Sequence, residues 1–146
     1  MKLALNSAFL NRPDTGSGQY LLHLVEELSR PDSGVSAQLF QPPTGRNADK
    51  LSFEQLGFPR AARAIRADLA HVPYFGSALW PRVPTVVTIH DLIPIVLPAY
   101  RGSLKVRAYT ELVSRAARRA HAIIADSEAS KRDIVRRLSI GLWRAS

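Results

Sequence analysis

Two glycines separated by one residue lie in the sequence Thr15-Gly16-Ser17-Gly18, between a short apolar run and an amphipathic segment. Glycines let a backbone approach an anion closely, and the N–H groups that begin a helix attract negative charge. Binding of a phosphate or diphosphate by Gly16, Ser17 and Gly18 is therefore one interpretation. A plain turn between a strand and a helix is the other, because a single Gly-x-Gly pattern is not specific.

The glycine spacing argues against two familiar nucleotide sites. A third glycine is missing after Gly18, and the run Phe40-Gln41-Pro42 lacks the acidic residue with which a dinucleotide-binding protein holds a ribose. The sequence also has no Gly-Lys-Ser/Thr, so a P-loop is excluded.

A second pair with chemical potential, His90-Asp91, directly follows the apolar run 85–89. A histidine at the carboxyl end of a central strand can donate a hydrogen bond to a substrate hydroxyl or phosphate, or act as a base. Asp91 can orient His90, contact the ligand or cap the next segment. The alternative is a structural histidine whose ring is satisfied by the backbone. Adjacent residues lack metal-ligand spacing, and the sequence has no cysteine, so no metal site or other cofactor is predicted.

The elements expected around these residues alternate between strand and helix. Short apolar runs predict strands, and apolar residues spaced three and four apart predict helices. The expected strands are 2–7, 35–40, 67–72, 84–89 and 122–125; the expected helices begin at 17, 59, 103 and 128; residues 41–57 are expected to be irregular. This alternation predicts a Rossmann-like, doubly wound α/β sheet with mainly parallel strands. Ligands bind such sheets beyond the carboxyl ends of the strands, here at loops 8–18, 72–80 and 90–98.

The charge is concentrated in the second half of the sequence. Of the net charge of +8, residues 74–146 contribute +7. The helix expected at 103–120 has an apolar arc on one side and an arginine-rich face on the other. The apolar arc consists of Val106, Tyr109, Val113, Ala116, Ala117 and Ala120, and the basic face of Arg107, Arg115, Arg118 and Arg119. This face is either solvated or suited to an anionic membrane surface. The tyrosines are scattered, so nucleic-acid binding is not favoured.

The N-terminus and the apolar runs indicate the cellular compartment of the protein. The run after Met1 is too short for a signal peptide, and no apolar stretch approaches the length of a membrane span. We therefore expect a cytoplasmic protein, with peripheral contact at the inner face of the membrane as an open alternative.

Four segments together resemble the N-terminal domain of family 4 glycosyltransferases, the retaining enzymes of GT-B fold. They read TGSGQY at 15–20, DLAH at 68–71, VVTIHDL at 86–92 and AHAIIADSEASKRDI at 120–134, and the resemblance covers 2–138. It implies transfer of a sugar from a nucleotide-diphosphate donor to an acceptor, without a metal and with the anomeric configuration kept. It also implies that this domain holds the acceptor, that Gly16 and Gly18 approach the donor phosphates or the acceptor, and that His90 lies near the transferred sugar.

The resemblance further implies a partner, a C-terminal domain that carries the nucleotide pocket and a pair of glutamates. Only the short tail 139–146 follows Leu138, so that domain is expected to be absent. Without it the charge of the leaving diphosphate has no complete electrostatic partner, and we expect the chain alone to be inactive. The resemblance leaves the identity of the acceptor open: it is a sugar, a lipid-linked molecule or another compound. The alternative function is a non-catalytic basic module that binds an anionic membrane surface or a partner protein.

Overall fold

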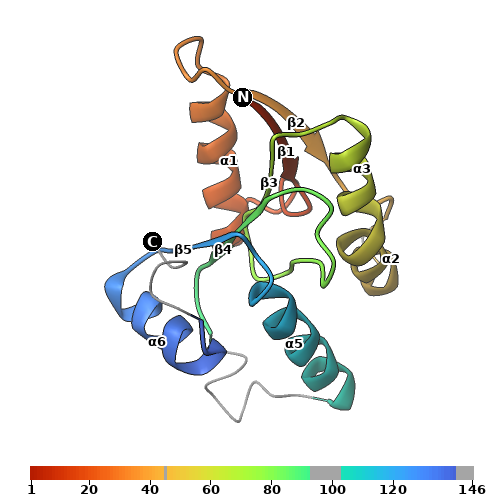
Figure 1. The fold of residues 1–146 in the computed structure, drawn as a ribbon, viewed down its shortest axis with the longest axis vertical. Coiled ribbons are helices and arrows are strands. Elements are labelled where there is room, and N and C mark those ends of the chain that lie inside the picture. Colours follow the sequence, from red (N-terminus) through yellow and green to blue (C-terminus); the bar gives the residue numbers. More distant parts are fainter. Residues whose placement is uncertain (45, 93–102, 141–146) are drawn as a thin grey trace.

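The computed structural model describes residues 1–44, 46–92 and 103–140 and arranges them in three layers, with a sheet between two sets of helices (Figure 1). The sheet has five parallel strands in the order β2-β1-β3-β4-β5. Their bounds are β1 Lys2–Asn6, β2 Ser36–Phe40, β3 Leu69–Val72, β4 Thr85–Ile89 and β5 Ala122–Ala125. The doubly wound α/β fold predicted from the sequence is therefore confirmed.

Helices cover both faces of the sheet. Helices α1 (Gly16–Leu28) and α6 (Glu128–Leu138) lie on one side in Figure 1. The other side carries α2 (Asn47–Ser52), the π-helical turn η1 (Phe53–Gly57), α3 (Phe58–Ala64) and α5 (Leu104–Ala117). The central strands are buried by both layers, as their apolar runs predict. Fully buried side chains include Leu5, Leu21, Val87, Ile89, Ile123 and Ile134.

The interval 41–57, expected to be irregular, is the main error in the predicted elements. It contains α2 and η1, which lead directly into α3. Phe53 is buried there, and Lys50 forms an ion pair with Glu54 one turn later, with a 2.9 Å distance between Nζ and Oε1. Few apolar residues mark this stretch, so its periodicity is weak. Tertiary burial of Phe53 and of the ion pair stabilises the helix instead.

Helix α5 begins where predicted but differs from the prediction at its last turn and in its apolar arc. It ends at Ala117, before the expected Ala120, and the side chain of Val106 is exposed instead of lying on the apolar arc. The buried part of the arc is Val113, Ala116 and Ala117. The first turns of α5 extend below the sheet in Figure 1, and residues 104–108 are exposed.

The strand order places a topological switch point between β1 and β3. From β1 the chain crosses to β2 on one side, and from β3 it continues through β4 to β5 on the other. The loops that follow β1 and β3 therefore diverge beyond the carboxyl ends of these two strands and leave room for a ligand. Two predicted regions lie outside the described residues, namely the loop beyond Leu92 and the tail beyond Ile140. Within the described part of the chain, no helix has the length and apolarity needed to cross a membrane.

Candidate functional site at the carboxyl edge of the sheet

The glycine turn after β1 is held by Thr15. Its Oγ1 accepts a hydrogen bond from the N–H of Gly18 (3.1 Å) and donates to the carbonyl of Arg12 (2.8 Å), so Thr15 caps α1. The two glycines differ in their surroundings. A Cβ at Gly18 would overlap the Arg12 carbonyl, whereas a Cβ at Gly16 would meet nothing within 4 Å. Gly18 is required by the turn itself, and Gly16 occupies an open position at the start of α1.

His90 lies directly after β4, and both of its ring nitrogens have partners. Nδ1 is 2.7 Å from Oδ2 of Asp126, and Nε2 is 3.2 Å from the carbonyl oxygen of Pro73. Both partners are acceptors, so the ring satisfies both at once only when it carries a proton on each nitrogen. The ring of Tyr20, from α1, packs edge-on against it with 5.0 Å between centroids. Contacts from three other segments of the chain thus fix the orientation of this imidazole.

The carboxylate that contacts the His90 ring is that of Asp126, whereas the sequence had pointed to Asp91 as one possibility. Asp91 is exposed at the position following His90. Asp126 lies directly after β5, which pairs with β4 so that Ile89 is opposite Ala125. The residues that follow two paired parallel strands meet at the same edge. This register is the signal that could have identified Asp126 from the predicted strands.

A short hydrogen-bond chain next to His90 includes Tyr20, another residue that no local sequence pattern marks. The Thr88 hydroxyl donates to the Tyr20 hydroxyl (3.3 Å) and contacts Nε2 of His71 (2.9 Å). His71 is buried, and burial, with a smaller contribution from the charge at His90, lowers its pKa to about 4. Because the Thr88 hydroxyl gives its one proton to Tyr20, it accepts the hydrogen bond from Nε2 of a neutral His71. His71 thus contacts Thr88 inside the domain, below the site surface.

The structure brings the glycine turn and His90 to the same edge through Tyr20, which lies one helical turn after Gly16 in α1. The sequence profile of Glycosyltransferase Family 4 matches residues 26–143, which is most of the chain. The chain belongs to glycosyltransferase family 4. The match includes His90, Asp91 and Asp126 and begins after the glycine turn. No curated protein matches the chain. Family membership indicates a glycosyltransferase-type function for this domain.

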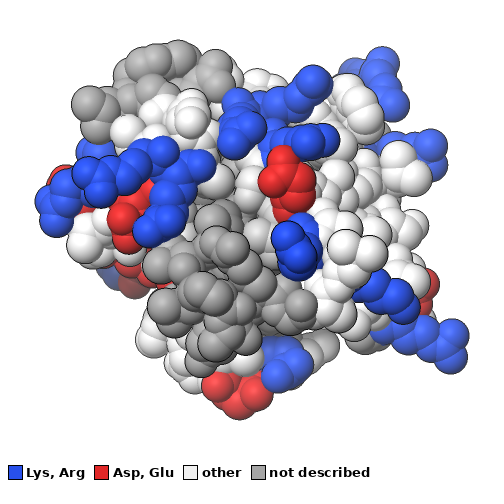
Figure 2. Space-filling model, turned by 90° about the horizontal axis from the view of Figure 1, so that it is seen from below, with Lys and Arg blue, Asp and Glu red and all other residues white. Residues whose placement is uncertain are grey.

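The charged residues of the family 4 domain are dispersed at this end of the molecule. Figure 2 looks from below, toward the end to which the strands run in Figure 1. Its Lys and Arg side chains lie in separate groups, with Asp and Glu among them. Among the described residues, no three His, Asp or Glu side chains are grouped closely enough to hold a metal ion.

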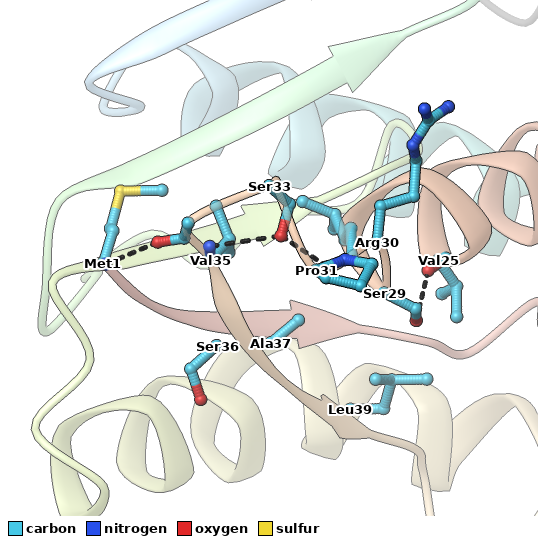
Figure 3. A pocket seen from close by; sticks show the side chains of 12 residues that line it. Met1, Val25, Ser29, Arg30, Pro31, Ser33, Val35, Ser36, Ala37 and Leu39 are labelled. Carbon is cyan, nitrogen blue, oxygen red and sulfur yellow. Dashed lines mark hydrogen bonds between the residues drawn. The ribbon is translucent and has the colours of Figure 1, made fainter.

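A hollow of about 630 Å³ lies elsewhere on the family 4 domain (Figure 3). It is lined by Met1, by the end of α1 and by the start of β2, so it is at the amino ends of the strands. Arg30 is its one charged side chain, the N-terminal ammonium of Met1 donates to the Gly34 carbonyl beside it, and the remaining lining is apolar or small and polar. It lies at the end of the strands opposite to the one where doubly wound sheets bind their ligands. The carboxyl edge with His90 remains the candidate site.

Proposed function

We propose that this domain is the acceptor side of a retaining GT-B glycosyltransferase, which moves a sugar from a nucleotide-diphosphate donor to an acceptor. The observation that supports the proposal best is the fixed imidazole of His90 at the carboxyl edge of the sheet. A side chain held by Asp126, the Pro73 carbonyl and Tyr20 needs little reorganisation to meet a substrate. Family membership supplies the reaction class.

In the proposed reaction His90 donates a hydrogen bond to a hydroxyl of the transferred sugar. Its contact with Asp126 is the shorter one and involves a charge, so we expect it to persist when substrate binds. The longer contact, from Nε2 to the Pro73 carbonyl, is exchanged for the sugar hydroxyl. Asp126 then serves as a positioning residue that fixes the ring while Nε2 faces the substrate.

The glycine turn is assigned to the donor phosphates or the acceptor. Gly16 and Ser17 begin α1, where the helix dipole favours negative charge, and the open space at Gly16 permits a close approach. Asp91 is assigned to a polar group of the ligand. The nucleotide itself is assigned to a second α/β unit that faces this edge and neutralises the leaving diphosphate without a metal. Residues 1–146 alone are therefore expected to transfer little or no sugar.

The test is His90→Ala in the enzyme assembled with its donor-binding unit. Loss of one well-oriented donor is expected to lower the rate of transfer by about 10²-fold or more. His23→Ala is the matched control, because His23 is an exposed residue of α1 that pairs with Glu26. Circular dichroism of both variants checks that the fold is intact. Near-normal turnover in a folded His90→Ala enzyme would remove His90 from the mechanism.

A second candidate function, contact with an anionic membrane, is favoured by the exposed start of α5. Leu104 is 80% exposed and Val106 41% exposed, and the basic residues Lys105 and Arg107 alternate with them. Apolar side chains flanked by cations suit the boundary of an anionic bilayer. Co-sedimentation with phosphatidylserine vesicles at low salt tests this function. Binding is expected to fall with added salt and with Leu104→Asp, but not with Leu56→Asp, another exposed leucine. No sedimentation at low salt would exclude it.

A further inference from the structure

A pocket of about 450 Å³ lies on the other side of the loop that carries the glycine turn. It is lined by the start of this loop, by the segment that follows β2 and by α2, so it opens at the same carboxyl edge as His90. Its size is within the range of about 300–1,000 Å³ typical of small-molecule sites. None of the groups assigned to donor phosphates above lines this pocket.

The two cations of the pocket are already neutralised. Arg12 donates two hydrogen bonds to the carboxylate of Asp14, each 3.1 Å long. The Nζ of Lys50 is 2.9 Å from Oε1 of Glu54, a residue that is only 1% exposed. A phosphate would have to compete with a carboxylate at each cation. The net charge of the two pairs is zero, so the pocket gives an anion little electrostatic advantage over a neutral ligand, even though two basic residues line it.

Uncharged polar side chains supply most of the other polar groups of the pocket. Asn11, Gln41 and Asn47 carry amides, which offer both donors and acceptors, and Phe9 adds an aromatic surface. The side-chain nitrogen of Gln41 makes a contact of 3.4 Å with the Ser7 carbonyl, which limits how this amide turns. Paired donors and acceptors beside an aromatic ring match a molecule that has many hydroxyls and an apolar C–H face.

Lys50 is held in place at the edge of this pocket by aromatic rings. Its Nζ lies 5.7 Å from the ring centre of Phe9, 5.1 Å from that of Tyr74 and 5.0 Å from that of Tyr109. It also donates to the Tyr109 hydroxyl (2.9 Å). An ammonium group has three donors, and Glu54 and Tyr109 account for two of them. With its side chain 28% exposed, Lys50 can offer the third to a ligand.

The ring of Phe9 is fixed from behind. It packs edge-on against Tyr74 with 4.8 Å between centroids, and the Tyr74 hydroxyl accepts a hydrogen bond of 3.0 Å from buried Asn6. Gly76 makes this packing possible, because a Cβ there would overlap the Tyr74 ring and approach Glu54. The pocket wall is thus formed before a ligand arrives, which lowers the entropic cost of binding.

We propose that this pocket binds the acceptor through a neutral, hydroxyl-rich sugar unit. The apolar face of the sugar lies against Phe9, its hydroxyls exchange hydrogen bonds with the amides of Gln41 and Asn47, and Lys50 donates to one ring or hydroxyl oxygen. The proposal rests on the proposed function in naming this ligand the acceptor. It goes further in stating that the acceptor is bound as a sugar and not through a phosphate.

Binding can be measured on the chain itself by ¹H–¹⁵N NMR titration. The probes are methyl α-D-glucopyranoside, methyl α-D-mannopyranoside, N-acetylglucosamine and, as the anion, inorganic phosphate. At least one sugar is expected to shift the amide signals of Phe9, Asn11 and Asn47 in a saturable way, and phosphate is expected to leave them unchanged. Absence of a response to all three sugars, or a saturable response of these signals to phosphate, overturns the proposal.

Variants inside and outside the pocket show where the sugar binds. Gln41→Ala and Asn47→Ala should each weaken the sugar's Kd about fivefold, the effect of one hydrogen bond. Gln38→Ala is the matched control, since Gln38 lies on exposed β2 just before Gln41 and outside the pocket. Equal affinity in Gln41→Ala, Asn47→Ala and the control, with the fold intact, would also overturn the proposal.

Kinetics in the assembled enzyme separate this inference from the proposed function. Asn47→Ala is expected to raise the acceptor KM with kcat nearly unchanged, because the contact is equally strong in the ground and transition states. An unchanged KM overturns the inference and leaves transfer that depends on His90 intact. Saturable sugar binding in the pocket, together with normal transfer by His90→Ala, overturns only the proposed role of His90.

Discussion

The Nδ1 of His90 lies 2.7 Å from Oδ2 of Asp126, although 36 positions separate the two residues in the sequence. They meet because β4 and β5 pair in parallel with Ile89 opposite Ala125, and each side chain belongs to the residue directly after its strand. The contact therefore depends on the register of the sheet. It makes the imidazole a hydrogen-bond donor on its Nδ1 side and directs Nε2 toward the end of β3.

Asp126→Asn is expected to change the hydrogen bonding of His90 without unfolding the domain, because Asp126 is 45% exposed. An amide is a weaker acceptor than a carboxylate, so the proton on Nδ1 should exchange faster with water. Long-range ¹H–¹⁵N NMR spectra of the histidine rings report this directly. Asp91→Asn is the control and should leave the ring signals of His90 nearly unchanged, since both ring nitrogens contact other residues. Identical spectra for wild type and Asp126→Asn would contradict the arrangement.

Alanine at the two glycines of the turn should have opposite outcomes. Gly18→Ala places a Cβ onto the Arg12 carbonyl, so the loop must move, and we expect a loss of about 1–3 kcal/mol in the free energy of unfolding. Gly16→Ala meets no atom within 4 Å and replaces the first glycine of a helix, so it should be neutral or stabilise by up to about 1 kcal/mol. Urea unfolding of both variants checks this. Equal losses would show that Gly18 is not specifically constrained.

Most of the fold could be predicted from the sequence because its strands are short apolar runs separated by clear helix signals. Residues 85–89 and 122–125 are such runs, and α6 begins at residue 128 as predicted, with Ser127 as its cap accepting a hydrogen bond from the Ser130 N–H. The interval 41–57 could not be predicted in the same way. Its helix depends on the burial of Phe53 and on the contact between Glu54 and Tyr109, a residue 55 positions away.

The candidate site was predicted in part. Gly16, Gly18 and His90 stand out because glycine pairs and a histidine after a strand are local patterns. Tyr20 and Asp126 do not stand out, because each acquires its role only when α1, β4 and β5 come together. The aromatic cage of Lys50 draws on Phe9, Tyr74 and Tyr109 from three distant segments. No local spacing encodes such a cluster.

Removing the charge of Lys50 should destabilise the domain strongly. Lys50→Met leaves the buried carboxylate of Glu54 without its cation, at an expected cost of about 3–5 kcal/mol in the free energy of unfolding. Adding Glu54→Gln removes the buried charge, so the double variant should recover part of the loss. Lys105→Met is the matched control at an exposed position and should stay within about 0.5 kcal/mol of wild type. If the loss in the double variant equalled the sum of the losses in Lys50→Met and Glu54→Gln, the two residues would not be a coupled pair.

The buried His71 should make the domain less stable in mild acid. Its pKa is lowered from 6.5 to about 4 in the folded state, so between these values the unfolded chain takes up a proton that the folded chain does not. The free energy of unfolding should therefore fall as the pH drops from about 6.5 to about 4, by up to about 3 kcal/mol from this residue, and His71 should add no further change below pH 4. His71→Asn keeps a hydrogen-bonding side chain beside Thr88 but cannot titrate, so its stability should depend less steeply on pH. Urea unfolding at pH 7, 6, 5 and 4 measures both profiles, with the exposed His23→Asn expected to follow wild type. An unchanged slope in His71→Asn would mean that other groups cause the acid sensitivity.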